Sequence, residues 1–453
     1  MSKYDINIEK TYNFPQTIKK VPFNGQTLVI SPLTANWIVL QTENQLDIFN
    51  DFCVGKSIKD VLDCSLYNDM EVIEVVTQIE ARKFCNINVN KSTENGRNLH
   101  LYLTNKCNLR CPYCYMFSGK ENDNELSTEE VINLIRNYKN IAYGKRITLS
   151  GGEPSIRMDF DQIVKEASNI GLEVKILING SLMTSERIAN IAKYLNSVQI
   201  SIDGFSEESN ATIRGVGHFQ KALNAVERFV SYGIETSVAI TPPWELLKSS
   251  KGEYVKFAKE LIVKYEGKPF EVKFAEGLST GRTIQPSEEL NKDYANLIKS
   301  IQKDVYGELF ELSVFVEKMS TNTIFDNCMF GVFSISSTGD VYLCPEIGSL
   351  MPIANIRTNS FKEICDKADI AEKATCISML SPCNKCELMY ICGGGCRIKE
   401  FPKLVKRTSF SNLNYAGISS RVCYPAIKER FYKMMIESNE YLYSPIGNDT
   451  ERN

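Results

Sequence analysis

Histidine is scarce in this sequence, and long apolar runs are missing. The 453 residues include two histidines, which leave almost no material for a zinc site of several imidazoles or for a histidine-centred catalytic triad. No apolar stretch approaches the length needed to cross a bilayer, so we expect no membrane association. The first residues, MSKYDINIEKTYNF, lack the apolar segment and the cleavage site of a secretory signal, which predicts a cytoplasmic protein.

An excess of charge of one sign is also missing, whereas cysteine is abundant. The net charge of −3 gives no broad attraction to nucleic acid, and we expect no nucleic-acid partner. A reducing compartment keeps thiols reduced, so the fifteen cysteines are better explained by metal ligation than by a disulfide framework. Three of them, Cys53, Cys64 and Cys85, fall in helical or turn patterns and are interpreted as buried small hydrophobic residues.

The order of elements predicts three domains and a tail, because a chain of this length exceeds one ordinary core. Residues 1–95 contain a strand at 26–31, followed by helical patterns that begin near Glu43, Ser57 and Asp69. A strand followed by three short helices predicts a winged-helix-like domain.

The rest of the chain predicts two further domains of different character. Residues 96–310 alternate six β-branched runs with amphipathic helices, which predicts an α/β fold with a partial (β/α)6 barrel of the TIM type. Residues 311–443 are rich in cysteine and have too few apolar periods for an independent core, so bound metal is expected to contribute folding energy. Residues 444–453 are polar and predict a disordered tail.

Three cysteines follow the first predicted barrel strand, HLYLT. Cys107, Cys111 and Cys114 have the spacing CxxxCxxC on one loop. Three thiolates leave the fourth iron of a cubane open, as chelation of a small molecule requires, whereas a structural cluster is normally closed by four cysteines. A zinc loop or a chance spacing is the alternative. With Tyr113 before the last cysteine, the motif resembles the hallmark of radical S-adenosylmethionine (SAM) enzymes.

Later strand ends extend this resemblance. SGGEP at 150–154 resembles the GGEP element of the family, whose backbone lies along the amino group of SAM and in which Glu153 offers that group a carboxylate. By resemblance, Ser201, together with Asn179 or Asp203, faces the ribose, and Arg214 is suited to bind the methionyl carboxylate with two hydrogen bonds. Each motif alone could be ordinary loop chemistry. The cofactor-binding residues that the resemblance implies are Tyr113, Gly151, Gly152, Glu153, Asn179, Ser201, Asp203 and Arg214.

A second array of seven cysteines lies downstream. It consists of Cys328, Cys344, Cys383, Cys386, Cys392, Cys396 and Cys423. In order and spacing, the array resembles the SPASM extension found behind many radical SAM domains, which holds two auxiliary clusters. The resemblance implies that Cys328, Cys344 and Cys396 bind the first auxiliary cluster and that the other four bind the second. The alternative is a pair of zinc ribbons, because CxxC pairs also suit tetrahedral zinc.

The three [4Fe–4S] clusters that the resemblance implies need more ligands than the motifs supply. Ten motif cysteines leave two irons without a ligand, and SAM takes one of these. The other belongs to the first auxiliary cluster, because no cysteine lies between Cys114 and Cys328. Our hypothesis is that this iron binds a cysteine thiolate of the substrate, or is closed by Cys365, Cys376 or a non-cysteine group.

The N-terminal domain resembles the element that binds the leader sequences of ribosomal peptides. A winged helix could also bind DNA, but the third predicted helix, residues 69–82, carries four acidic residues and one arginine instead of a basic recognition face. We therefore prefer addition of a leader peptide to a sheet edge over a purely structural role.

Together the resemblances imply a peptide-modifying enzyme. The reduced first cluster splits SAM, and a 5′-deoxyadenosyl radical abstracts a hydrogen from a ribosomal precursor peptide, with a thioether as the expected product. A reductant such as a flavodoxin or ferredoxin supplies the electron. The alternatives are an anaerobic sulfatase-maturating enzyme that forms formylglycine and a maturase that forms carbon–carbon links or epimerises. Two non-enzyme functions are also considered, an iron–sulfur electron carrier and a peptide-binding scaffold. The intact CxxxCxxC and GGEP elements argue against both.

Overall fold

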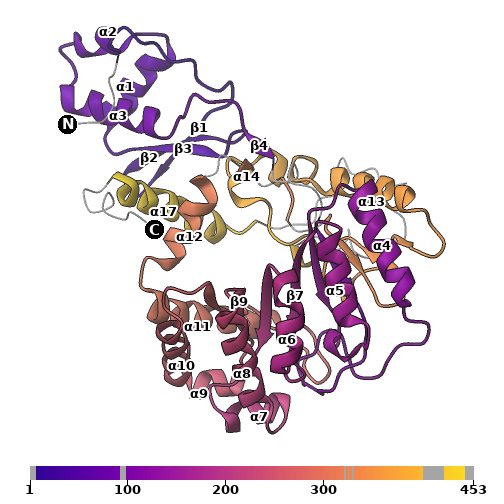
Figure 1. Cartoon of the computed structure of the whole chain (residues 1–453). Helices are drawn as coiled ribbons and strands as arrows, with labels where there is room; N and C mark the ends of the chain where they lie inside the picture. The colour runs from indigo at the N-terminus through magenta and orange to yellow at the C-terminus, as the bar shows by residue number, and fades with distance from the viewer. Residues whose placement is uncertain are drawn as a thin grey trace.

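A computed structural model describes residues 7–91, 98–320, 323–324, 326–328, 331–400 and 423–443. Figure 1 shows an N-terminal unit of strands and helices, a central sheet with helices packed against it, and the helix α17 beside the N-terminal strands. The tail that the sequence predicts to be disordered lies outside the described residues. Within the described ranges, no helix is both long enough and apolar enough to span a membrane.

The centre of the molecule is a nine-stranded sheet. Six of its strands lie in sequence order, and each pairs in parallel with the next. They are β5 (Leu99–Tyr102), β6 (Arg146–Ser150), β7 (Glu173–Ile178), β8 (Ser197–Ser201), β9 (Glu235–Ile240) and β10 (Phe270–Phe274). The six strands predicted from the sequence are confirmed, and their carboxyl ends share one edge of the sheet. The closure of these strands into a partial barrel stays a prediction.

The cysteine-rich segment extends the same sheet beyond β5. The strand β12 (Phe333–Ile335) pairs in parallel with β5, and β13 (Asp340–Tyr342) and β14 (Ala354–Asn355) continue the sheet antiparallel. The sequence did not predict these strands, because runs of two or three residues are too short to show an alternating pattern. One continuous sheet therefore spans residues that were expected to form two domains.

Amphipathic helices pack on this sheet, and most of them turn an apolar face toward the main core. The first, α4 (Thr128–Ile141), begins at the predicted capping box, in which Ser127 and Glu130 cap each other's backbone amides. The other helices along the parallel strands are η2 (Pro154–Ile156), α5 (Phe160–Asn169), α6 (Ser185–Ile191), η3 (Ala192–Tyr194), α7 (Glu207–Arg214), α8 (His218–Ser231), α9 (Trp244–Ser249), α10 (Lys251–Lys264) and α11 (Glu288–Tyr306).

The N-terminal unit contains a three-stranded antiparallel sheet, in the order β1-β2-β3. The sequence predicted β2 and the three helices but missed β1 and β3. The overlooked signal is Asn24-Gly25, a two-residue hairpin turn in which both residues have positive φ. The likeness to a winged helix stays a prediction. The elements are β1 (Lys19–Phe23), β2 (Gln26–Ser31), β3 (Asn36–Leu40), α1 (Glu43–Cys53), α2 (Ile58–Leu62) and α3 (Asp69–Ala81).

The two faces of this small sheet pack against different partners. Val29 and Ile38 pack on α1, α2 and α3, whereas Leu28 and Trp37 pack on α12 (Phe310–Ser320), α14 (Met389–Cys392) and α17 (Pro425–Tyr443) (Figure 1). The cysteine-rich segment, expected to lack a core of its own, shares one with the N-terminal sheet. The remaining elements are β4 (Asn90–Lys91), β11 (Thr323–Ile324), η4 (Ile347–Ser349), α13 (Phe361–Thr375), η5 (Ile377–Met379), η6 (Cys383–Lys385) and α15 (Arg397–Glu400).

The N-terminal cysteines correct one prediction. Cys64 and Cys85 are half-buried, but Cys53 is exposed, so the expectation of burial is wrong for Cys53. It is the last residue of α1, where the helix leaves the core formed by Phe49 and Phe52.

Candidate active site

The loop that carries the first three cysteines begins just after β5. The backbone N–H of Cys107 donates to the carbonyl of Gly119 at 3.1 Å, and the N–H of Cys114 donates to the carbonyl of Cys111 at 3.3 Å. The N–H of Leu109 donates to Sγ of Cys107 at 3.4 Å. Bonds from backbone N–H groups to sulfur are among the contacts that tune the potential of an iron–sulfur cluster.

The three thiols lie near one another and are half-buried. Burial raises the pKa of Cys107 to about 11, and the charges of Glu153, Cys111 and Cys114 add to this rise. The Cys107 thiol must therefore lose its proton when a metal binds. Among the described residues, no three His, Cys, Asp or Glu side chains are spaced to hold one metal ion. A cubane fits this donor set, because it distributes its thiolates over different irons.

The GGEP element after β6 is fastened to the cysteine loop. The N–H of Gly152 donates to the carbonyl of Thr104 at 2.8 Å, and the N–H of Glu153 donates to the carbonyl of Lys106 at 2.9 Å. A Cβ at Gly151 would lie 2.4 Å from the Thr104 carbonyl oxygen, and a Cβ at Gly152 would lie 2.4 Å from that of Lys106. The two glycines therefore allow the GGEP backbone to pack directly against the cysteine loop. Their place along SAM stays a prediction.

Glu153 is fully buried and joins two strand ends. Its Oε2 accepts a 2.6 Å hydrogen bond from the N–H of Asn179, and its Oε1 accepts from the N–H and the hydroxyl of Ser155. Burial raises the pKa of this carboxyl, although these hydrogen bonds and Arg187 act in the opposite direction. Its role toward the SAM amino group stays a prediction, and the structure adds that the carboxylate ties β6 to β7.

Asp203 and Arg214 form a buried ion pair near the cysteine loop. Nε of Arg214 donates to Oδ2 of Asp203 at 2.7 Å, and the N–H of Thr241 donates to Oδ1 at 3.0 Å. Burial opposes the charge of Arg214, but Asp203 and Cys111 outweigh this effect and raise its pKa. Within the described residues the Nη groups of Arg214 form no hydrogen bond, which leaves them for a carboxylate.

The other predicted contacts lie around this pair. Asn179 is buried, and its Nδ2 donates to Oδ1 of Asn108 on the cysteine loop at 2.9 Å. Ser201 is half-buried as the last residue of β8. Tyr113 packs against the main core, and burial raises the pKa of its hydroxyl, with the charge of Asp203 adding to the rise. The structure therefore brings the predicted cysteines and SAM contacts to one edge of the sheet.

Sequence reasoning missed a tyrosine pair between the two cysteine arrays. The hydroxyl of Tyr102 donates to the carbonyl of Pro345 and lies 3.4 Å from the hydroxyl of Tyr115. Tyr115 follows Cys114 in the sequence, and Pro345 follows Cys344. A tyrosine next to a cysteine motif is a weak signal, and spacing alone cannot show that the two motifs meet.

The downstream cysteines form two neighbourhoods. Burial raises the pKa of Cys344 to about 12, and the charges of Cys328 and Cys396 add to the rise. Burial also raises the pKa of Cys386 to about 11, and Cys423 contributes. These neighbours fall within the two ligand sets that the resemblance to SPASM proteins implies.

A buried arginine braces this region. Arg397 is fully buried and donates to the carbonyls of Thr375 at 2.8 Å, Gly393 at 3.0 Å and Gly395 at 2.8 Å, so it holds the turn between Cys392 and Cys396. The two cysteines considered as an additional ligand are placed differently. Sγ of Cys376 donates to a backbone carbonyl at 2.9 Å, and Cys365 packs against the main core.

Side chains close the outer edge of β3 in the N-terminal unit. Oε1 of Gln78 accepts from the N–H of Val39 at 2.9 Å, and its Nε2 donates to the carbonyl of Val39 at 2.8 Å. Nε of Arg82 donates to the carbonyl of Trp37 at 3.1 Å, and the N–H of Trp37 donates to Oδ1 of Asn36 at 2.9 Å. The backbone groups that a further strand would use are therefore already bonded.

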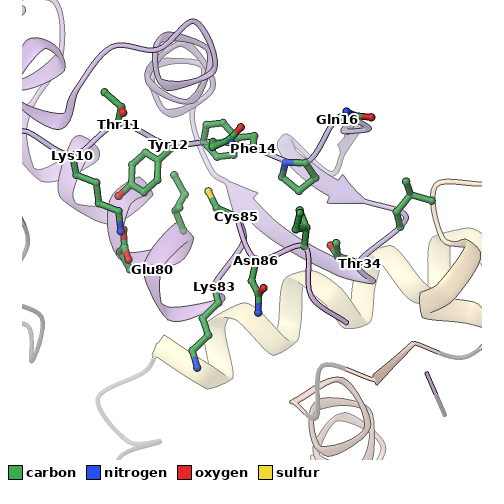
Figure 2. Close-up of a pocket in the computed structure, with 15 residues that line it drawn as sticks. Lys10, Thr11, Tyr12, Phe14, Gln16, Thr34, Glu80, Lys83, Cys85 and Asn86 are labelled. Carbon is green, nitrogen blue, oxygen red and sulfur yellow. The ribbon is translucent and has the colours of Figure 1, made fainter. Parts of the chain in front are cut away.

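A cavity of about 830 Å³ lies near the start of β3, between the segment before β1 and the end of α3. Figure 2 shows Tyr12 and Phe14 from that segment on one side of it and Cys85 on another. Lys10 and Glu80 form an ion pair of 2.6 Å at its border. The cavity is mainly apolar with a charged rim, a composition that suits a side chain of a bound peptide.

Family comparisons agree with the geometry of the site. Residues 101–243 match the model of the radical SAM superfamily, and residues 327–387 match the SPASM model, an iron–sulfur cluster-binding domain. The chain is therefore a radical SAM enzyme with a SPASM domain, a class that uses [4Fe–4S] clusters and SAM.

Individual relatives are identical to this chain at about a quarter of the aligned residues. Mycofactocin maturase MftC of Mycobacterium ulcerans is 27% identical over 314 residues, which cover 66% of this chain and 82% of MftC. Sporulation killing factor maturation protein SkfB of Bacillus subtilis is 28% identical over 278 residues, 60% of this chain and 65% of SkfB. The structure of native anSMEcpe with bound AdoMet has a TM-score of 0.54 at 19% identity and covers 76% of this chain and 97% of that one, which shows a shared fold.

Proposed function

We propose that this enzyme modifies a ribosomally made precursor peptide and that its product is a thioether. The observation that carries the proposal is the cysteine loop with a buried arginine beside it and a second cysteine array against the same sheet. The relatives named as maturation proteins, MftC and SkfB, support peptide maturation as the class of reaction.

The residues of the first site have different proposed roles. When bound, the cluster and SAM supply a 5′-deoxyadenosyl radical, which takes a hydrogen atom from the peptide. Cys107, Cys111 and Cys114 would hold three irons. Arg214 would bind the methionyl carboxylate through its two Nη groups, while Asp203 holds its Nε. The burial of Arg214 and Asp203, whose side chains are 14% and 6% exposed, would limit the access of bulk water to this part of the site.

The downstream cysteine array is the reason for proposing a thioether as the product. Its seven cysteines would hold two auxiliary clusters, three [4Fe–4S] clusters in all, with one iron left for a substrate thiolate or for Cys365, Cys376 or another group. A thiolate held there would lie on the side of the sheet that carries β12, next to β5 and its cysteine loop. Forming the thioether removes two hydrogen atoms from the peptide: the hydrogen on carbon would leave with 5′-deoxyadenosine, and the thiol hydrogen would leave as a proton while its electron passes to a bound iron–sulfur cluster.

The N-terminal unit would bind the leader of the peptide at one of two sheet edges. Pro22 stands on the outward side of β1 and has no N–H to donate, which weakens that edge. The edge of β3 has a full set of backbone groups at Trp37 and Val39, but Gln78 and Arg82 occupy them. Addition of a leader strand to β3 therefore requires these side chains to swing away.

The test is an oxygen-free reaction of the reconstituted enzyme with SAM, a flavodoxin or chemical reductant, and a cysteine-containing precursor peptide from a neighbouring open reading frame. We expect 5′-deoxyadenosine and a peptide that has lost two hydrogen atoms, with the cysteine no longer alkylatable. Formylglycine in place of cysteine would instead identify a sulfatase-maturating activity, and an unchanged mass with an inverted residue would identify epimerisation. No 5′-deoxyadenosine under any condition would contradict the proposal as a whole.

A further inference from the structure

His218, at the start of α8, is one of two histidines in the chain and lies buried between two loops of the site. Its Nε2 is 2.9 Å from the carbonyl oxygen of Asn179, and its Nδ1 is 3.0 Å from Nδ2 of Asn210. A carbonyl oxygen can only accept, so Nε2 carries the proton and Nδ1 accepts from the Asn210 amide. These two contacts fix one tautomer of the neutral imidazole.

Asn210 connects His218 to the end of β8 through hydrogen bonds. Its side chain is fully buried, and Oδ1 accepts from the N–H of Asp203 at 3.1 Å and from the N–H of Gly204 at 3.3 Å. A Cβ at Gly204 would lie 2.2 Å from the backbone nitrogen of Asn210, so no other residue fits beneath this amide. The imidazole thus reaches the backbone of Asp203 through one side chain.

The connections continue at both ends. The N–H of Asn179 donates to Glu153 after β6, and the side chain of Asp203 binds Arg214 and the N–H of Thr241 after β9. One series of hydrogen bonds therefore links the carboxyl ends of four adjacent strands, from β6 to β9. In its middle, His218 spans the gap between the end of β7 and the end of β8.

We propose that His218 is a positioning residue for SAM, acting through Asn179 on one side and through Asn210 and Asp203 on the other. It sets the separation between the ends of β7 and β8, beside which lie the predicted ribose contacts and, at the end of α7, the arginine for the methionyl carboxylate, so the inference rests on those predicted contacts. It does not rest on the identity of the peptide. A neutral ring that donates at one nitrogen and accepts at the other suits this place, since a protonated imidazole could not accept from Asn210.

The test compares His218→Phe, which keeps a ring of similar size without either hydrogen bond, with His100→Phe. His100 lies on β5, and burial lowers the pKa of both imidazoles to about 4, so the two substitutions remove similar groups. The dissociation constant for SAM is measured by equilibrium dialysis on the oxygen-free, cluster-loaded enzyme without peptide. The change in the electron paramagnetic resonance spectrum of the reduced cluster on adding SAM gives a second readout.

We expect His218→Phe to weaken SAM binding by about tenfold or more, as loss of a buried hydrogen-bonded link implies, while His100→Phe stays within about twofold of wild type. In His218→Phe, the fold-increase in KM for SAM should exceed the fold-decrease in kcat for formation of 5′-deoxyadenosine. His218→Gln retains a hydrogen-bond donor and should therefore recover part of the affinity for SAM. If His218→Phe fails to retain its iron, His218→Gln and Asn210→Leu are compared in the same way. Wild-type affinity in an iron-loaded His218 variant overturns the inference, even if the peptide substrate proves different from the one proposed.

Discussion

Arg214 donates from Nε to Oδ2 of Asp203 over 2.7 Å, and the two side chains are only 14% and 6% exposed. The same guanidinium acts on the thiol of Cys111, where it opposes the rise in pKa that burial causes. An unpaired charge at this depth would be costly, so Asp203 allows a cation to be held beside the cysteine loop. The guanidinium of Arg214 is therefore held in place beside the cysteine loop by the protein's own residues.

Replacing Arg214 should impair binding of SAM more than folding of the chain. Arg214→Lys keeps the charge but loses the planar fork, so one amine cannot bind both Asp203 and a carboxylate with the same geometry. We expect the dissociation constant for SAM to rise about tenfold or more, with little change in iron content. Arg228→Lys, on α8, provides the control. Unchanged SAM affinity in Arg214→Lys would show that the carboxylate binds elsewhere.

Removing one cysteine of the first loop should abolish chemistry but leave the auxiliary clusters. Cys111→Ala takes away one of three iron ligands, so the enzyme should lose the iron of one cluster and all formation of 5′-deoxyadenosine. Cys64→Ala, in the N-terminal unit, is the matched control and should keep both. Iron analysis and chromatography of the reaction mixture provide the measurements. Turnover that persists in Cys111→Ala would refute the assignment.

A methyl group added at Gly152 should disrupt the packing of the GGEP element against the cysteine loop. Gly152→Ala places a Cβ 2.4 Å from the carbonyl oxygen of Lys106, and both backbones must move. We expect a loss of about 1–3 kcal/mol in the free energy of unfolding and poor cluster incorporation. Gly252→Ala, in α10 with no atom within 4 Å of the added Cβ, should be neutral or stabilising. Equal urea midpoints for the two variants would contradict the prediction.

The leader peptide should bind better when the edge of β3 is opened. Gln78→Leu removes the amide that satisfies Val39, so the free energy of unfolding should fall by about 1–3 kcal/mol while the edge becomes available. Fluorescence anisotropy with a labelled leader peptide should then show tighter binding. Pro22→Ala restores an N–H on β1 and should leave leader affinity unchanged. The opposite result, with only Pro22→Ala increasing affinity, would place the leader on β1.

Two imidazoles with lowered pKa values predict a loss of stability in mild acid. Burial lowers the pKa of His100 and His218 to about 4, and for His218 the charge of Arg214 adds to this effect while Asp203 and Glu207 oppose it. In the unfolded chain the pKa returns to about 6.5, so between these values the unfolded chain binds more protons and the free energy of unfolding falls as the pH falls. Urea unfolding from pH 7 to pH 4.5 measures this slope. It should be shallower in His218→Phe, and an identical slope would mean that the imidazole is already protonated in the folded chain.

The sequence predicted those parts of the structure that have a local signature. All six parallel strands were visible as β-branched runs, and the start of α4 was visible from Ser127 and Glu130. Motif spacing also placed Cys107 and Gly152 on loops at strand ends, whereas Arg214, expected in a loop, is the last residue of α7. These features depend on neighbours in the chain, which is why a single sequence contains them.

Contacts between distant segments were not predictable in this way. Tyr102 meets Tyr115 and the loop of Pro345 because β12 pairs with β5, and nothing in either segment specifies that register. His218 was noticed only as a rare residue, since its function depends on the carbonyl of Asn179 and the amide of Asn210 in the folded chain. The side chains that complete the outer edge of β3, Gln78 and Arg82, likewise meet Val39 and Trp37 only in the folded chain.

The pairing of β12 with β5 limits how this enzyme can be divided. A truncated chain that ends at residue 310 would leave β5 as an open, apolar strand immediately before the cysteine loop, and would also uncover Leu28 and Trp37. Such a fragment should aggregate instead of acting as a minimal enzyme. Chimaeras intended to exchange substrate range should therefore carry the first and last thirds of a single parent together, because these two parts of the chain are one unit in packing although they are far apart in sequence.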